Sequence, residues 1–116
     1  MISEKIEVIK DAYDYLKSLK KGIVDCVNCI QEGNEVEAMK LIPLIADGID
    51  WIINVVRVTK DAQKNKLDIY KINSHLEEMI YAMENEDYIL VGDLFNYEIL
   101  PILNEIEEEF QLILEN

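Results

Sequence analysis

The chain has 116 residues, half of them apolar, and a net charge of −13 from 24 acidic and 11 basic residues. This length suits one domain over residues 1–116, and the apolar content argues against a disordered chain. The apolar runs are far shorter than the roughly 20 residues of a membrane span. The N-terminus also lacks the pattern of a signal peptide, so we expect a cytoplasmic protein.

The charge is unevenly distributed along the chain. Residues 72–116 hold 12 acids and no lysine or arginine, whereas residues 1–71 hold the other 12 acids and all 11 bases. Such an acidic surface repels phosphate backbones and anionic membranes and attracts basic proteins. We therefore expect no nucleic-acid or membrane partner, although acidic surfaces also serve simply to keep small proteins soluble.

The first half of the chain predicts two helices. The first covers residues 3–31, with a cap at Ser3 and an end at Gly33 and Asn34. The second runs from Glu35 to about residue 60, and Pro43 inside it predicts a kink or a break near Leu41 and Ile42. The polar residues 59–66 form the connection that follows. The apolar stripes of the two helices are Ile6, Ile9, Tyr13, Leu16, Ile23, Val27 and Ile30, and Met39, Ile42, Ile45, Ile49, Ile52 and Val56.

The second half predicts helices at about residues 67–84 and 87–114, with Pro101 inside the latter. Their stripes are Ile69, Ile72, Leu76, Met79, Ile80 and Met83, and Phe95, Ile99, Ile102, Ile106, Phe110 and Ile113. Short links between four helices predict an all-α fold, an antiparallel up-down four-helix bundle with Pro-kinked second and fourth helices.

The two halves also resemble each other at an offset of 53 residues. That offset places one apolar stripe on the other: Leu16, Leu19, Ile23, Val27 and Ile30 fall on Ile69, Ile72, Leu76, Ile80 and Met83. A duplicated helical hairpin would produce this match. Any two amphipathic helices also align at some offset, so both explanations stand.

Cysteine and histidine, which often bind metals or take part in redox chemistry, are present, but the further residues that such sites need are missing. Cys26 and Cys29 have the spacing of redox and zinc sites, but a zinc site needs two more ligands and a redox pair needs the start of a helix. We interpret them as packed thiols that form no disulfide. His75 and Glu78 share a helix face, but no second histidine completes a di-metal site.

Acidic residues are also better explained by structure than by catalysis. The run of three glutamates at 107–109 is typical of a solvated helix face. Asp47 and Asp50 flank Gly48 near Trp51, a mix that would suit either a pocket or, as we prefer, a close helix crossing at the glycine. No phosphate-binding loop, catalytic triad or nucleotide fingerprint is found. The sequence therefore predicts neither an enzyme nor a cofactor.

Residues 88–103 are apolar on nearly all sides of the predicted helix, which is unusual for one helix of a bundle. With the core stripe set aside, Leu90, Leu94, Tyr97 and Pro101 form a second strip at steps of four, three and four. The region around Trp51 shows a similar apolar excess. These five residues are the predicted interaction surface.

The same segment carries a resemblance. Residues 84–94, an acidic turn with Asp87 and Tyr88 leading into a Leu-rich helix, and residues 97–103, with Tyr97, Glu98 and Pro101, resemble a family of small uncharacterised helical proteins of low-GC Gram-positive bacteria. The resemblance covers about residues 84–103 and implies a helical domain of unknown function, with no activity attached. In size, acidity and helicity the chain is also similar to flagellar and secretion chaperones.

Two hypotheses of function follow. The first is a non-enzymatic interaction protein, an adaptor or chaperone-like bundle that acts through its second and fourth helices. Its partner would be a second copy, forming a homodimer, or a protein with a basic surface. The second is a bundle that binds a small molecule or metal in an interior cavity lined by Asp47, Trp51, His75 and Glu78.

Overall fold

The computed structural model describes residues 2–115, and no strand occurs among them, which confirms the all-α class. The elements in chain order are α1 (Ile2–Gln31), α2 (Glu35–Val58), the short 3₁₀ turn η1 (Lys60–Ala62), α3 (Tyr70–Glu84), α4 (Tyr88–Leu94), the π-helical turn η2 (Phe95–Ile99) and α5 (Leu100–Leu114). The predicted helix bounds therefore agree with the structure to within about three residues.

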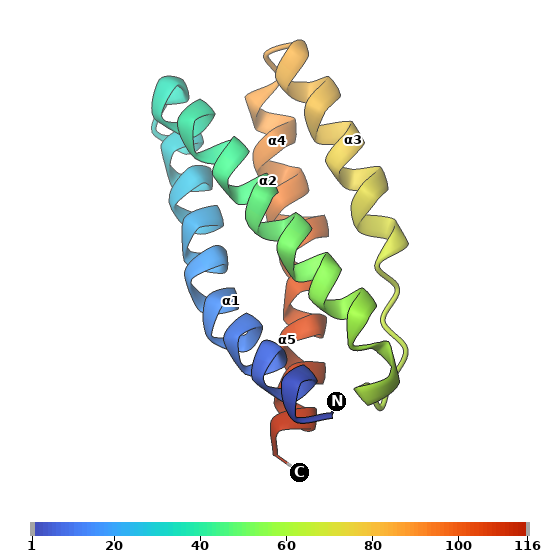
Figure 1. Cartoon of the computed structure of the whole chain (residues 1–116). Helices are drawn as coiled ribbons and strands as arrows, with labels where there is room; N and C mark the ends of the chain where they lie inside the picture. Colours follow the sequence, from blue (N-terminus) through green and yellow to red (C-terminus); the bar gives the residue numbers. More distant parts are fainter. Residues whose placement is uncertain (1, 116) are drawn as a thin grey trace.

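The segments α4, η2 and α5 follow one another as one long rod, which lies beside α1 (Figure 1). α1 packs against α2, α4 and α5, whereas α3 packs against α4 and η2. Within residues 2–115, none of the helices combines the length and the hydropathy needed to cross a bilayer.

Helix α1 ends in a turn that reverses the chain. Gly33 has a positive φ of 76°, its N–H donates to the carbonyl of Ile30, and the N–H of Asn34 donates to the carbonyl of Cys29. This pattern is the Schellman motif, which satisfies the last carbonyls of a helix. The side chain of Asn34 then accepts a hydrogen bond from the N–H of Glu37 and caps α2.

Gly48 of α2 is buried against side chains of α1. A Cβ at this position would lie 2.9 Å from Cδ1 of Leu19 and still closer to the hydroxyl of Tyr15. A larger residue at this position would require the side chains of Tyr15 and Leu19 to move. The predicted helix contact at Gly48 is thus confirmed, and Gly48 also lines a hollow with Asp47 and Trp51, as the alternative expected.

The two prolines are accommodated differently. α2 continues as one helix from Glu35 to Val58 with Pro43 inside it, so the alternative of a break is wrong and the kink stays a prediction. Before Pro101 the helix widens into η2, where the N–H of Leu100 donates to the carbonyl of Phe95, five residues back. The π-helix is rare and occurs mostly, as here, as a single turn inside an α-helix.

The π turn keeps the core side chains of the last rod in line. Val91, Phe95, Ile99 and Leu103 are buried in three successive steps of four residues. In a straight α-helix three such steps would rotate the buried face by about 120°. The wider turn absorbs part of that rotation, so α4 and α5 both face the core.

α3 is the helix that deviates most from its predicted face. Ile72, Met79 and Ala82 are buried, but Ile80, predicted to lie inside, is 58% exposed. Because α3 packs mainly against α4 and η2, a narrower stripe suffices. Met39 on α2 is likewise 38% exposed, since it lies at the edge of its helix's buried face.

Candidate functional site

Five apolar side chains on α1 and α2 remain partly or largely exposed on one side of the α1–α2 pair. They are Val8 and Tyr15 of α1, and Leu44, Trp51 and Val58 of α2. Residues seven apart lie on the same side of a helix, two turns away from each other. Each helix therefore contributes one line of side chains, and Tyr15 contacts Trp51 where the two lines meet. We call these five residues the α1–α2 apolar strip.

A shallow hollow of about 400 Å³ lies in the middle of the strip. Its walls are Tyr15, Leu44 and Trp51, Gly48 also lines it, and Asp47 is at its edge. The rings of Tyr15 and Trp51 meet edge to face with centroids 5.5 Å apart and an interplanar angle of 86°. This aromatic arrangement is favourable and fixes the Trp51 ring in place.

Sequence reasoning found Trp51 but missed the rest of the strip. The α2 part of the strip has a signal in the sequence, because Leu44, Trp51 and Val58 recur every seven residues beside the buried stripe of α2. It was obscured because Tyr15 and Val8 come from a different helix, and their place beside α2 depends on the crossing at Gly48.

The predicted strip on residues 90–101 does not form. Leu94 is buried at 5% exposure, so its assignment to an interaction surface is corrected to the core. Leu90 is partly buried against the core, whereas Tyr97 is 70% exposed and Pro101 is exposed. The steps of four, three and four assumed a regular α-helix, and the π turn at Phe95–Ile99 interrupts that regularity.

The cavity of the second hypothesis is not assembled. His75 lies between two carboxylates, with Nδ1 at 3.2 Å from Oε1 of Glu78 and Nε2 at 3.3 Å from Oε2 of Glu98. It thereby links α3 to η2, and it does not line the hollow that contains Trp51 and Asp47. Among residues 2–115 no group of three or more histidine, cysteine or acidic side chains is arranged to hold a metal ion.

Both cysteines lie near the end of α1. Cys26 is fully buried, and its thiol lies 3.8 Å from the carbonyl oxygen of Ala38 on α2. Burial, and to a lesser degree the neighbouring Cys29, raises the pKa of Cys26 to about 11. A thiol in such a setting stays protonated at neutral pH and is a poor nucleophile.

The three consecutive glutamates do not form one solvated face, which corrects the prediction. Glu108 is exposed, Glu107 pairs with Lys20 of α1 at 2.7 Å, and Glu109 is buried at 3% exposure. Glu109 accepts hydrogen bonds from the backbone N–H groups of Lys64 and Asn65 and from the Asn65 side chain. Its carboxylate thus fastens the loop after η1 to α5.

Comparison with known proteins gives a family without an assigned activity. A model of a domain of unknown function, DUF8042, matches residues 7–109, well beyond the segment on which the sequence resemblance rests. Neither the curated proteins nor the solved structures gave a match. Because the family model covers most of the chain, this protein belongs to the DUF8042 family of domains of unknown function.

Proposed function

We propose that this protein is a non-enzymatic interaction module, an up-and-down helical bundle that binds a second copy of itself through the α1–α2 apolar strip. The observation that supports this is the exposure of large apolar side chains in one line: Leu44 is 67% exposed, Trp51 41% and Val58 61%. Burying one such side chain contributes roughly 1.5–3 kcal/mol. Soluble monomers seldom leave a contiguous apolar patch uncovered unless it serves binding.

The spacing of the strip suits a helical partner. Apolar residues seven apart are the pattern by which helices pack along one another. A second copy presents the same pair of helices, so a two-fold axis would place each strip against its own image. Trp51 lies near the middle of the strip, and a fixed central tryptophan is the kind of residue that dominates binding energy.

Charge favours this face over the rest of the surface. Residues 1–71, which include α1 and α2, hold 12 acids and 11 bases, a net of −1. Residues 72–116 hold 12 acids and no lysine or arginine, a net of −12. Two copies that meet through α1 and α2 therefore keep their strongly acidic halves apart, which lowers the repulsion between them.

Light scattering tests the proposal. The wild-type protein should give about twice the chain mass of 13.5 kDa. Leu44→Asp, at an exposed site, should give a folded monomer. Ile89→Asp is the matched control, because Ile89 is 78% exposed on α4 and lies outside the strip. A wild-type monomer at high concentration, or a Leu44→Asp dimer, contradicts the proposal.

A basic protein partner is the second candidate, and the acidity of residues 72–116 is the observation that favours it. In that case the acidic half would accelerate encounter and the apolar strip would supply affinity. The discriminating measurement is the salt dependence of the association rate with a purified partner. A rate independent of salt would contradict electrostatic steering.

A further inference from the structure

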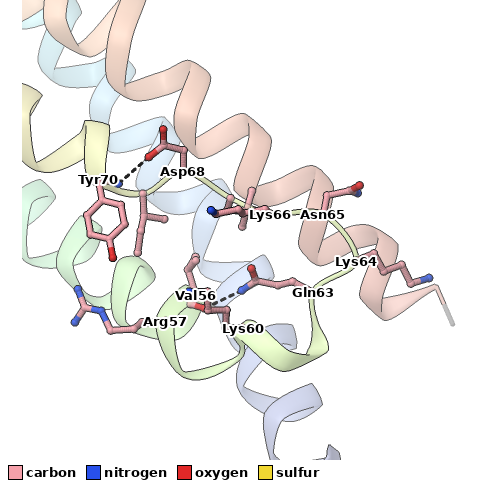
Figure 2. Close-up of a pocket in the computed structure, with 11 residues that line it drawn as sticks. Val56, Arg57, Lys60, Gln63, Lys64, Asn65, Lys66, Asp68 and Tyr70 are labelled. Atoms are coloured by element: carbon pink, nitrogen blue, oxygen red, sulfur yellow. Dashed lines mark hydrogen bonds between the residues drawn. The ribbon is translucent and has the colours of Figure 1, made fainter.

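A second hollow lies at the end of α2, away from the turns at residues 32–34 and 85–87. It has a volume of about 710 Å³ and is enclosed by the last turn of α2, by η1 and by residues 63–70. This volume lies within the range of pockets that hold small organic molecules. Figure 2 shows side chains from these three segments placed around one space.

The charge of this hollow is opposite to that of the protein. Four of the 11 basic residues, Arg57, Lys60, Lys64 and Lys66, line it, against one acid, Asp68. None of the four forms an ion pair with any residue in the range 2–115. In Figure 2 Lys66 extends across the hollow, whereas Lys64 points away from it. Arg57, Lys60 and Lys66 thus supply positive charge without an acidic partner, although the Arg57 guanidinium also donates to Oδ1 of Asn54 at 3.2 Å.

The floor of the hollow is apolar. Val56 is buried, and Leu67 and Ile69 are partly buried against the core. At the rim, the Tyr70 ring lies on the same side as Arg57, and Tyr70 is 79% exposed. A floor of this kind favours a ligand with a hydrocarbon or aromatic body beside its charge.

The carbonyl groups at the end of α2 do not counteract the positive charge. The last carbonyls of a helix carry partial negative charge and would repel an anion. Here the Thr59 hydroxyl donates to the carbonyl of Val55 at 2.6 Å, and the Gln63 amide donates to that of Val56 at 2.7 Å. These two carbonyls are therefore already engaged.

The loop that forms one wall is held in place. Glu109 of α5 accepts hydrogen bonds from the N–H groups of Lys64 and Asn65 at 2.6 and 3.3 Å. On the other side Tyr70 N–H donates to the carboxylate of Asp68 at 3.2 Å. The wall is thus pre-formed, and little ordering would oppose ligand binding.

From these observations we infer that the hollow binds a small organic anion, a carboxylate or phosphate ester with an apolar body. Arg57, Lys60 and Lys66 contact the anionic group, and Val56, Leu67 and Ile69 contact the body. This inference is independent of self-association, because the α1–α2 apolar strip shares no residue with the hollow.

Calorimetry with three probes tests the inference: 1-naphthyl phosphate, neutral 1-naphthol and inorganic phosphate. Naphthyl phosphate should bind at least about tenfold more tightly than either of the others, because only it engages both rim and floor. Equal affinity for naphthol would show an apolar hollow without an anion site. Equal affinity for inorganic phosphate would show that the floor plays no part. Either result, or no binding at millimolar concentration, overturns the inference.

Variants place the ligand in this hollow. The double variant Arg57→Gln, Lys66→Gln should weaken binding of naphthyl phosphate at least about tenfold, while Lys64→Gln, the matched control, should change it less than about twofold. All three side chains are exposed, so the fold should persist, as circular dichroism would verify. Unchanged binding in the double variant overturns the assignment.

Discussion

Gly33 and Glu86 occupy the same place in two turns that lie 53 residues apart. In the first turn the N–H of Gly33 donates to Ile30 and that of Asn34 to Cys29; in the second, the N–H of Glu86 donates to Met83 and that of Asp87 to Ala82. Both residues have a positive φ, 76° and 55°. The offset is the one that aligns the two halves of the sequence.

Each of the two turns is followed by a helix whose first residues are capped in the same way. The side chain of Asp87 accepts a hydrogen bond from the N–H of Leu90, as that of Asn34 does from Glu37. A duplicated hairpin would produce the shared hydrogen bonds, but unrelated helices commonly end in the same turn, so duplication stays a prediction. These hydrogen bonds also show that the unsatisfied carbonyls of a helix end dictate this turn, because a glutamate adopts the left-handed conformation that suits glycine better.

Beyond the turns the two hairpins differ. In the first, α2 crosses α1 at a glycine and carries a proline without interruption. In the second, the rod after the turn contains a π turn followed by a proline. A shared turn thus leads into two different ways of packing a helix pair.

The largest expected effect on stability comes from the loop at residues 63–69, which joins the two hairpins. Glu109→Ala removes the acceptor of two backbone N–H groups and should lower the free energy of unfolding by about 2–3 kcal/mol. The control Glu108→Ala, at an exposed position, should stay within about 0.5 kcal/mol. Urea denaturation measures both. Equal effects would mean that the loop does not fasten the first hairpin to the second.

A test of the helix crossing comes next in size. Gly48→Val adds a side chain where Leu19 and Tyr15 already fill the space, and it should cost about 1–3 kcal/mol. Gly22→Ala is the matched control on α1, where the nearest atom, of Ile45, is 4.0 Å away. That substitution should stabilise by about 0.5–1 kcal/mol through helix propensity. If thermal unfolding shows no difference between the two variants, close packing at Gly48 does not contribute to stability.

Substitutions at the two turn residues, Gly33 and Glu86, should have the smallest effects on stability, and these effects should have opposite signs. Gly33→Ala forces a side chain into the left-handed region and should destabilise by about 1 kcal/mol. Glu86→Gly relieves the same strain and should stabilise by several tenths of a kcal/mol. Chemical denaturation should resolve both changes. Destabilisation by Glu86→Gly would show that the glutamate side chain contributes something that the turn needs.

The sequence predicted those features that depend on local chemistry. The apolar stripe and Gly33 located α1 and its end, and the acidic turn before Tyr88 located the start of α4. Gly48 also indicated the helix crossing before any partner helix was known. These predictions succeed because capping, turn geometry and periodicity each act within a few residues.

What the sequence did not predict depends on contacts between distant segments. The sequence pattern puts Leu94 on the surface because that pattern holds for a regular helix, and the π turn next to Leu94 leaves no simple mark in the sequence. Glu109 was assigned to solvent because its hydrogen-bond partners lie more than 40 residues earlier in the chain. The basic hollow needs Arg57 and Lys66 brought together by the loop, which periodicity does not describe.

The π turn has a consequence for the spacing of the buried residues along the last rod. The buried residues Val91, Phe95, Ile99, Leu103, Ile106, Phe110 and Ile113 follow steps of four, four, four, three, four and three. Deleting one residue between Phe95 and Ile99 would change the second step to three, and the steps would then alternate regularly, as in an uninterrupted amphipathic helix. η2 therefore has the form of one extra residue in that pattern, and Tyr97 within it is 70% exposed. A deletion variant lacking Tyr97 would restore the regular alternation of steps of four and three.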